Sequence, residues 1–443
     1  MANNNINNNN IPNHIHRLHQ IAAYVSLVLL PLPGLPAKIG LIILFVGLLR
    51  IPTTIKSFGE LLKMPIFLLF VIWWLIAVIS GTWATHPTQS LLASPVLLLI
   101  IPSLFPVLKQ PRKYILAIGL GAVIHTAIQA ITWLGIVEGI RYLPMTVSGG
   151  LHWYPPFTSL WSTCALLLLL GLILNANSWK MRFVPLLIAI PLPVSLVLAG
   201  TRVLYIIFPL AIILLMVRLL MLSSTRVQKI TTLSVCTGII IVGLSFLLIP
   251  GSIGNQNLSR LANEVSSSTG NSNSRTEESR PIHKSQQFVN SVGLRYLWWN
   301  AGVDIWKKSP WLGHGNGSTK YQLAIHEAEI PTKYGADVSG FLISDPHSSI
   351  LATAIEQGLL GSTAMALLSL LAFLRSWRRS ISTPSLVGLS ACWLTVIAFS
   401  FVHTIQFSDY ASTLVVILVS FTVCIPKTNA INSYCNRDKR GIA

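Results

Sequence analysis

Long apolar runs alternate with short polar segments along most of this chain. A membrane-spanning helix needs about 20 apolar residues, and the pattern predicts twelve, at 20–33, 36–49, 65–81, 90–108, 114–135, 157–176, 183–200, 203–222, 230–249, 348–374, 384–403 and 408–425. The first two are short and separated by PLPGLP, so they form either two tilted spans or one re-entrant hairpin. We therefore predict an all-α polytopic membrane protein.

Composition supports this fold class. Of the 443 residues, 52% are hydrophobic and only 10% are charged, whereas soluble domains carry about 25% charged residues. This excludes a soluble enzyme, a disordered chain and a nucleic-acid-binding protein. The Asn-rich residues 1–19 predict a disordered N-terminus, and the first apolar run lacks the features of a cleaved signal peptide. Four of the five cysteines lie in apolar runs, so no disulfide framework is expected.

The positive charges predict the orientation, because short cytoplasmic segments are rich in Lys and Arg. With a cytoplasmic N-terminus, 19 of the 31 basic residues fall in cytoplasmic segments, together with only Glu60 and Asp438. The short outer loops and their edges hold Lys38, Arg141 and Arg202. The net charge of +18 is thus mainly a signal of topology. We predict that both termini, including the tail 426–443, are cytoplasmic.

One long outer loop, residues 250–346, separates spans nine and ten. Its first half is rich in Ser and Asn and is expected to be mobile. Its second half contains VGLRYLWWNAGVDIWKK, which predicts an amphipathic helix on the outer leaflet, because apolar residues recur at helical spacing: Leu294, Leu297, Trp298, Ala301 and Ile305. A Pro/Gly-rich turn, SPWLGHGNGS, follows, and SDPHSSI leads into the spans 347–425.

Polar residues at this outer surface are the candidates for chemistry. His347 follows Pro346, which disfavours helix before it, and Ser344 or Asp345 is expected to cap the helix that follows. Gly358 and Gly361 lie about three turns further on, where small residues let a neighbouring helix approach closely. Without a partner or substrate, His347 would be only a residue of the capping region.

Three further charged residues are candidates for a functional role. Arg202 in VLAGTRVLYI either has a functional partner or extends to the outer head groups. Arg295 lies one turn before Trp298 on the loop helix and could simply face solvent. Glu356, within span ten, is a functional candidate or else pairs with a polar neighbour.

Two other motifs carry less information. HEAE at 326–329 could bind a divalent metal, but its spacing fits no metal motif and we interpret it as solvated surface. GHGNG at 313–317 lacks the Walker Lys-Ser/Thr, so we interpret it as a turn, with His314 facing the site as the alternative. No metal and no other cofactor is predicted.

The combination of these features resembles the O-antigen ligase family of bacterial inner-membrane glycosyltransferases. In this chain the combination consists of twelve predicted spans, a large loop between spans nine and ten, and His347-Ser348 followed after nine residues by Gly358-x-x-Gly361. AGTR with Arg202, and Arg295 followed by Trp298 and SPWLGHG, resemble the family's two arginines. The resemblance extends from about 195 to 372. It implies a GT-C-like all-α fold and an active site on the periplasmic side.

The resemblance also implies an activity. The donor would be polysaccharide on undecaprenyl pyrophosphate in the membrane, and the acceptor a sugar hydroxyl of lipid A–core. Arg202 and Arg295 would bind the pyrophosphate, because guanidinium groups form bidentate contacts with phosphate. His347 would be the general base, since an imidazole ordinarily titrates near pH 6.5. Transfer would invert the anomeric carbon and need no metal. Trp298, His314, Asp345, Ser348 and Glu356 are secondary candidates.

Three alternatives remain open. An O-antigen polymerase uses the same donor but often has two sizeable outer loops, whereas here the next longest is 136–156. A protein O-oligosaccharyltransferase often carries an added C-terminal domain, which is not expected from the tail 426–443. A polysaccharide transporter would place several ionisable groups near the midplane, where this chain offers mainly Glu356.

Overall fold

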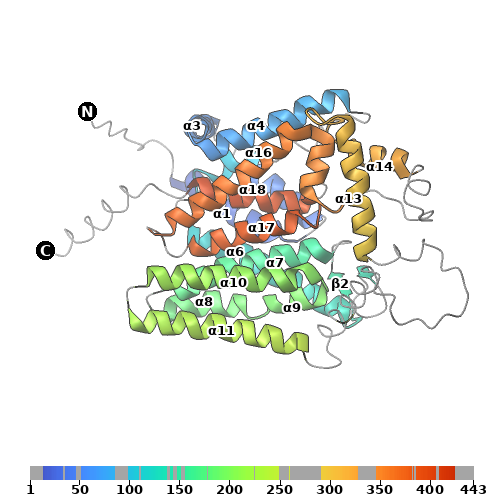
Figure 1. Cartoon of the computed structure of the whole chain (residues 1–443). Coiled ribbons are helices and arrows are strands. Elements are labelled where there is room, and N and C mark those ends of the chain that lie inside the picture. The colour runs from blue at the N-terminus through green and yellow to red at the C-terminus, as the bar shows by residue number, and fades with distance from the viewer. Residues whose placement is uncertain are drawn as a thin grey trace, which may run out of the picture.

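The computed structural model describes residues 13–32, 35–45, 51–84, 98–108, 111–136, 140–142, 147–150, 155–176, 178–223, 225–248, 259, 291–327, 346–381, 383, 386–405 and 409–424. Residues 1–12, most of the first half of the long loop and the C-terminal tail lie outside these ranges. The N-terminus was predicted to be disordered over residues 1–19, and this is wrong for residues 13–19, which form the start of the first helix. The chain is a helical bundle (Figure 1). The first part comprises α1 (Asn13–Leu29), α2 (Leu35–Phe45), α3 (Ile51–Leu62), α4 (Pro65–Ser80), a 3-10 turn (Gly81–Trp83), α6 (Pro111–Trp133), β1 (Ile140–Tyr142) and β2 (Val147–Gly150).

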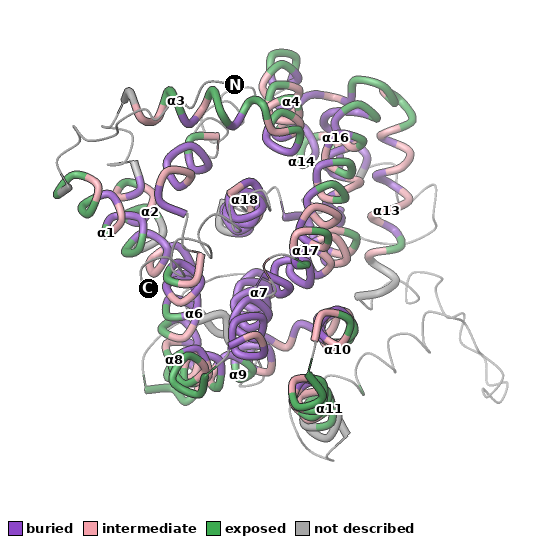
Figure 2. The backbone as a smooth tube through the Cα atoms, turned by 90° about the vertical axis from the view of Figure 1, so that its left-hand side faces the viewer, coloured by how far each residue is buried: buried purple, intermediate pink, exposed green. Residues whose placement is uncertain are grey.

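The second part begins with the most deeply buried helix. It comprises α7 (Pro155–Leu174), α8 (Trp179–Ala189), α9 (Leu192–Leu198), α10 (Arg202–Leu222), α11 (Arg226–Leu248), α13 (Ser291–Lys308), α14 (Thr319–Glu327), α16 (Ser349–Arg379), α17 (Val387–Ser400) and α18 (Asp409–Cys424). Helix α7 is buried along nearly its whole length and packs against α6, α8, α9 and α17, so it forms the centre of the bundle (Figure 2).

Small residues bring the central helices close together. A Cβ on Gly388 of α17 would lie 2.2 Å from the carbonyl oxygen of Leu167 in α7. Nearby, the Cys392 thiol donates to the carbonyl of Cys164 at 3.2 Å. Apolar helices in a membrane associate by such close packing, because burial of apolar surface gains little there.

The described residues support a polytopic membrane protein with fewer clear spans than predicted. Within them, six helices are long and apolar enough to cross a membrane, at Pro65–Trp83, Pro111–Trp133, Pro155–Leu174, Trp179–Leu198, Arg202–Leu222 and Ser349–Arg379. Two shorter apolar helices, Val387–Ser400 and Ala411–Cys424, accompany them. The count of twelve stays a prediction. The run 183–200 is divided into α8 and α9 near Pro191, and α3 was not predicted, because its sequence is amphipathic.

Arginine side chains form hydrogen bonds between helices at one end of the bundle. Arg218 of α10 donates to Ser380 Oγ at 2.8 Å and to the Trp377 carbonyl at 2.7 Å, and its guanidinium lies 4.4 Å from the Trp377 ring centroid. Arg112 of α6 donates to the Met181 carbonyl of α8 at 2.6 Å. These side chains donate hydrogen bonds to backbone carbonyls near helix ends, and they connect neighbouring helices. We call this the basic end.

The opposite end carries α13, α14 and the two-stranded hairpin, in which Arg141 pairs with Ser148 (Figure 1). This small antiparallel sheet, within the predicted outer loop 136–156, is an addition to the all-α prediction. The amphipathic loop helix is confirmed as α13, but its predicted contact with the membrane is wrong. Leu297, Ala301 and Ile305 pack against Ile355 of α16 and Leu323 of α14, because protein covers this face.

Candidate functional site

His347 lies at the start of α16 in an unusual backbone conformation. Its φ is +49°, and it is the single non-glycine residue with positive φ in the described part of the chain. Such conformations cost about 1–3 kcal/mol and cluster at functional sites. The helix that follows is capped by Ser348, whose Oγ accepts from the Leu351 N–H at 3.4 Å. The prediction that Ser344 or Asp345 caps it is therefore wrong, and both residues lie outside the described ones.

Two aromatic side chains define the position of the His347 ring. Trp298 of α13 lies against it, with ring centroids 4.5 Å apart and an interplanar angle of 31°. His403, in the turn after α17, meets it edge-on at 6.2 Å and 81°. The structure therefore joins the sequence candidates His347 and Trp298 with a histidine that is distant in sequence. We call His347, Trp298, His403 and Arg295 the histidine cluster, and this the His347 end.

His403 is buried and firmly held. Its ring stacks on Phe399 with centroids 4.4 Å apart, and its carbonyl accepts from both the backbone N–H and the hydroxyl of Ser349, at 3.1 and 2.9 Å. Burial lowers the pKa of His403 well below its usual value, and Arg295 and then His347 lower it further. The positive charge of Arg295 therefore acts on His403. Sequence reasoning gave His403 little weight, because it is a lone histidine at the end of an apolar run.

The lowered pKa of His403 predicts a pH dependence of stability. Unfolded, this histidine titrates near 6.5, so below that pH the unfolded state binds more protons and folding stability falls by at most about 1.4 kcal/mol per pH unit. We expect the melting temperature of the purified protein to fall between pH 7.5 and 5.5, and to fall less in His403→Gln. His14→Gln, which removes an exposed histidine, should keep the wild-type slope. Equal slopes in all three would contradict the assignment.

Arg202 is the first residue of α10, where Gly200 turns the chain at φ +59°. The preceding Thr201 is buried, and its hydroxyl oxygen accepts from Ser159 Oγ of α7 at 3.0 Å. Because Arg218 joins the far end of α10 to the far end of α16 at the basic end, α10 begins toward the His347 end. Arg202 and the histidine cluster thus share one end of the bundle, and α10 packs against α17, which ends near His403.

Helix α16 is broken at Gly358. Its φ and ψ of +64° and −160° belong to a region that is essentially restricted to glycine. The break leaves backbone groups open, and the turn 309–318 satisfies them: His314 N–H donates to the Ile355 carbonyl at 2.8 Å, Gly315 N–H to the Glu356 carbonyl at 2.9 Å, and Leu359 N–H to the Pro310 carbonyl at 2.8 Å. We predicted that the glycines admit a neighbouring helix. At Gly358 it is instead this turn that approaches.

Two of the secondary candidates lie where the turn 309–318 meets the break in α16. Glu356 is buried, accepts from Thr319 Oγ1 at 2.9 Å, and accepts from the backbone N–H groups of Gly317 and Thr319. The ring of His314 bonds to the Ile305 carbonyl of α13 at 2.9 Å. Both side chains therefore tie the turn to α13 and α16. This geometry favours a structural role for them.

Gly358→Ala is expected to destabilise the protein strongly. An added Cβ would lie 2.2 Å from the Trp311 carbonyl oxygen, and alanine at this φ and ψ costs about 3 kcal/mol before any clash. We expect a clear drop in melting temperature. Gly238→Ala is the matched control, because nothing lies within 4 Å of its added Cβ and alanine favours the α11 helix. An unchanged melting temperature for Gly358→Ala would show that the break is not required.

Comparison with known proteins agrees with the sequence resemblance. No curated protein sequence matches the chain significantly. The family model described as O-antigen ligase matches residues 184–366, a region that includes Arg202, Arg295 and His347. This match agrees with the sequence resemblance in the part of the chain that carries Arg295, Trp298 and His347, whereas His403 lies outside the matched region. Over residues 184–366 the chain is therefore similar to the O-antigen ligase family.

Proposed function

We propose that this protein is an O-antigen ligase that transfers polysaccharide from undecaprenyl pyrophosphate to a sugar hydroxyl of lipid A–core. The observation that carries the proposal is the contact of the His347 ring with Trp298 and His403 at one end of the bundle. The charge of Arg295 acts on His403 there, and Arg295, Trp298 and His347 lie within the O-antigen ligase match. A base and a guanidinium at the membrane edge suit a lipid-anchored donor and a lipid-anchored acceptor.

The reaction would be a single displacement. The oxygen of the acceptor hydroxyl attacks the anomeric carbon of the donor sugar from the side opposite the pyrophosphate, and His347 accepts the proton of that hydroxyl. The bond between that carbon and the phosphate oxygen breaks, its electron pair leaves with undecaprenyl pyrophosphate, and the configuration inverts. Arg202 and Arg295 stabilise the growing negative charge, most effectively where little water is present. His403 meets the His347 ring edge-on and would help to hold its orientation.

This mechanism requires the His347 end to lie on the periplasmic side of the inner membrane. The Lys and Arg bias of the short segments supports that orientation. A reporter fused after Ala443 should be active only if it functions in the cytoplasm. Activity of a reporter that requires the periplasm would overturn both the orientation and the assigned site.

Metal independence is part of the proposal, because two arginines can neutralise the leaving pyrophosphate without a divalent ion. Purified protein, given lipid-linked donor and core acceptor, should keep full activity in a strong chelator. Activity that is lost in chelator and restored by a divalent ion would contradict this mechanism and direct attention to the HEAE segment.

The nearest alternative is an O-antigen polymerase, and a lipopolysaccharide gel of a deletion strain separates the two. Loss of a ligase should remove all O-antigen bands and leave lipid-linked polymer in the inner membrane. Loss of a polymerase should leave core bearing a single repeat unit. The second pattern would exclude our assignment while leaving the donor chemistry intact.

A further inference from the structure

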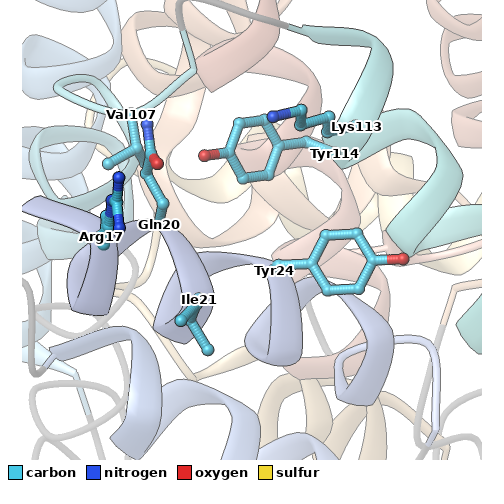
Figure 3. A pocket seen from close by; sticks show the side chains of 7 residues that line it. All are labelled: Arg17, Gln20, Ile21, Tyr24, Val107, Lys113 and Tyr114. Atoms are coloured by element: carbon cyan, nitrogen blue, oxygen red, sulfur yellow. The ribbon is translucent and has the colours of Figure 1, made fainter.

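A cavity of about 300 Å³ opens at the basic end, far from the histidine cluster. Helix α1 contributes Arg17, Gln20 and Tyr24, and α6 contributes Lys113 and Tyr114, with two aliphatic side chains between them (Figure 3). In the figure the two basic side chains lie on opposite sides of the cavity, and the Tyr114 hydroxyl points into it. The mechanism proposed above uses none of these residues.

The chemistry of the cavity favours an anion. Neither α1 nor α6 contains an acidic residue. Across the described ranges, Arg17 and Lys113 have no ion-pair partner, and the ion pair found there, Lys307–Asp304, lies on α13. Arg17 and Lys113 line this cavity from separate helices. A phosphate group in the cavity would therefore be attracted by both positive charges.

The surroundings distinguish a lipid phosphate from a soluble one. Leu18, Ile21 and Val25 are 57%, 59% and 37% exposed and follow one face of α1 at helical spacing. Ile21 also lines the cavity, so the apolar face runs directly into it. A soluble anion would contact only the charged and polar side chains of the cavity, whereas a phospholipid would also cover this face with its acyl chains. Tyrosine rings are typical of such a membrane interface, and basic pockets between membrane helices bind anionic head groups.

We propose that this cavity binds an anionic phospholipid of the leaflet at the basic end. Its phosphate lies between Arg17 and Lys113, and its acyl chains follow Leu18, Ile21 and Val25. The bound lipid joins α1 to α6, which pack together in the bundle. It therefore stabilises the N-terminal helices without contacting the histidine cluster.

The test measures lipid binding directly. Delipidated protein in detergent is titrated with phosphatidylglycerol, with phosphatidylethanolamine of the same acyl chains, or with inorganic phosphate, and bound lipid and melting temperature are recorded. We expect phosphatidylglycerol to bind and raise the melting temperature, and the other two to do so at least about tenfold less well. Arg17→Gln with Lys113→Gln should weaken phosphatidylglycerol binding about tenfold or more.

Matched variants separate the pocket from total charge and from misfolding. Lys180→Gln with Arg226→Gln removes the same charges from exposed positions at the basic end and should bind lipid like the wild type. Arg17→Lys with Lys113→Arg keeps the charge and should retain most of the binding. Equal binding by wild type and the pocket variant, equal binding of the two lipids, or full competition by inorganic phosphate would overturn the proposal. The readout does not depend on transfer activity, so it is independent of the ligase assignment.

Discussion

Replacing His347 by Ala is expected to abolish polysaccharide transfer in a purified system with lipid-linked donor and core acceptor. General base catalysis contributes about 10²- to 10⁴-fold, and no described side chain in the cluster can substitute: Trp298 is not basic, and His403 is buried and faces Phe399. Activity of the wild type should also fall at acidic pH, because the protonated imidazole cannot accept a proton. His347 is only half-buried, so the protein should still be expressed after the substitution.

A second variant protects this prediction from a folding artefact. His347 has φ +49°, and asparagine adopts positive φ more readily than alanine. His347→Asn should therefore keep the wild-type melting temperature and still lack transfer. His14→Asn, at the exposed start of α1, should keep full activity. Full activity of either His347 variant would remove the general base from the mechanism.

The apolar pattern predicted long helices well and predicted their interruptions poorly. Helices α7 and α10 begin and end within a few residues of the predicted spans, because a continuous apolar run leaves the backbone no other way to satisfy its polar groups in a bilayer. The break at Gly358 was missed, because hydropathy does not register a positive φ. Its partner is the turn 309–318, which lies about 40 residues earlier in the chain.

The candidate site was also only partly predictable from sequence, because some of its contacts form between segments that are distant in the chain. His347, Trp298 and Arg295 belong to local motifs that the sequence displays, whereas His403 joins them only because α17 ends beside the first turn of α16. Glu356 looked functional, because an isolated carboxylate in a membrane helix is costly. Its partners, Thr319 and the turn before it, reach it by tertiary folding that no local pattern reveals.

Arg202→Lys and Arg295→Lys are each expected to reduce transfer at least about tenfold, although both keep the positive charge. The planar guanidinium makes two parallel bonds to a phosphate, whereas an ammonium is a more strongly hydrated point charge. The loss should therefore appear mainly in kcat, because the bonds matter most as charge develops on the leaving pyrophosphate.

The structure offers a matched control for these substitutions at the opposite end of the bundle. Arg226 is exposed at the start of α11, so Arg226→Lys repeats the chemical change away from the histidine cluster and should leave transfer unchanged. A further readout is inhibition by inorganic pyrophosphate, which should weaken in both site variants if the arginines hold the leaving group. If both Lys variants kept full transfer and wild-type inhibition, Arg202 and Arg295 would be membrane-surface anchors, and charge stabilisation would have to come from other groups at the His347 end.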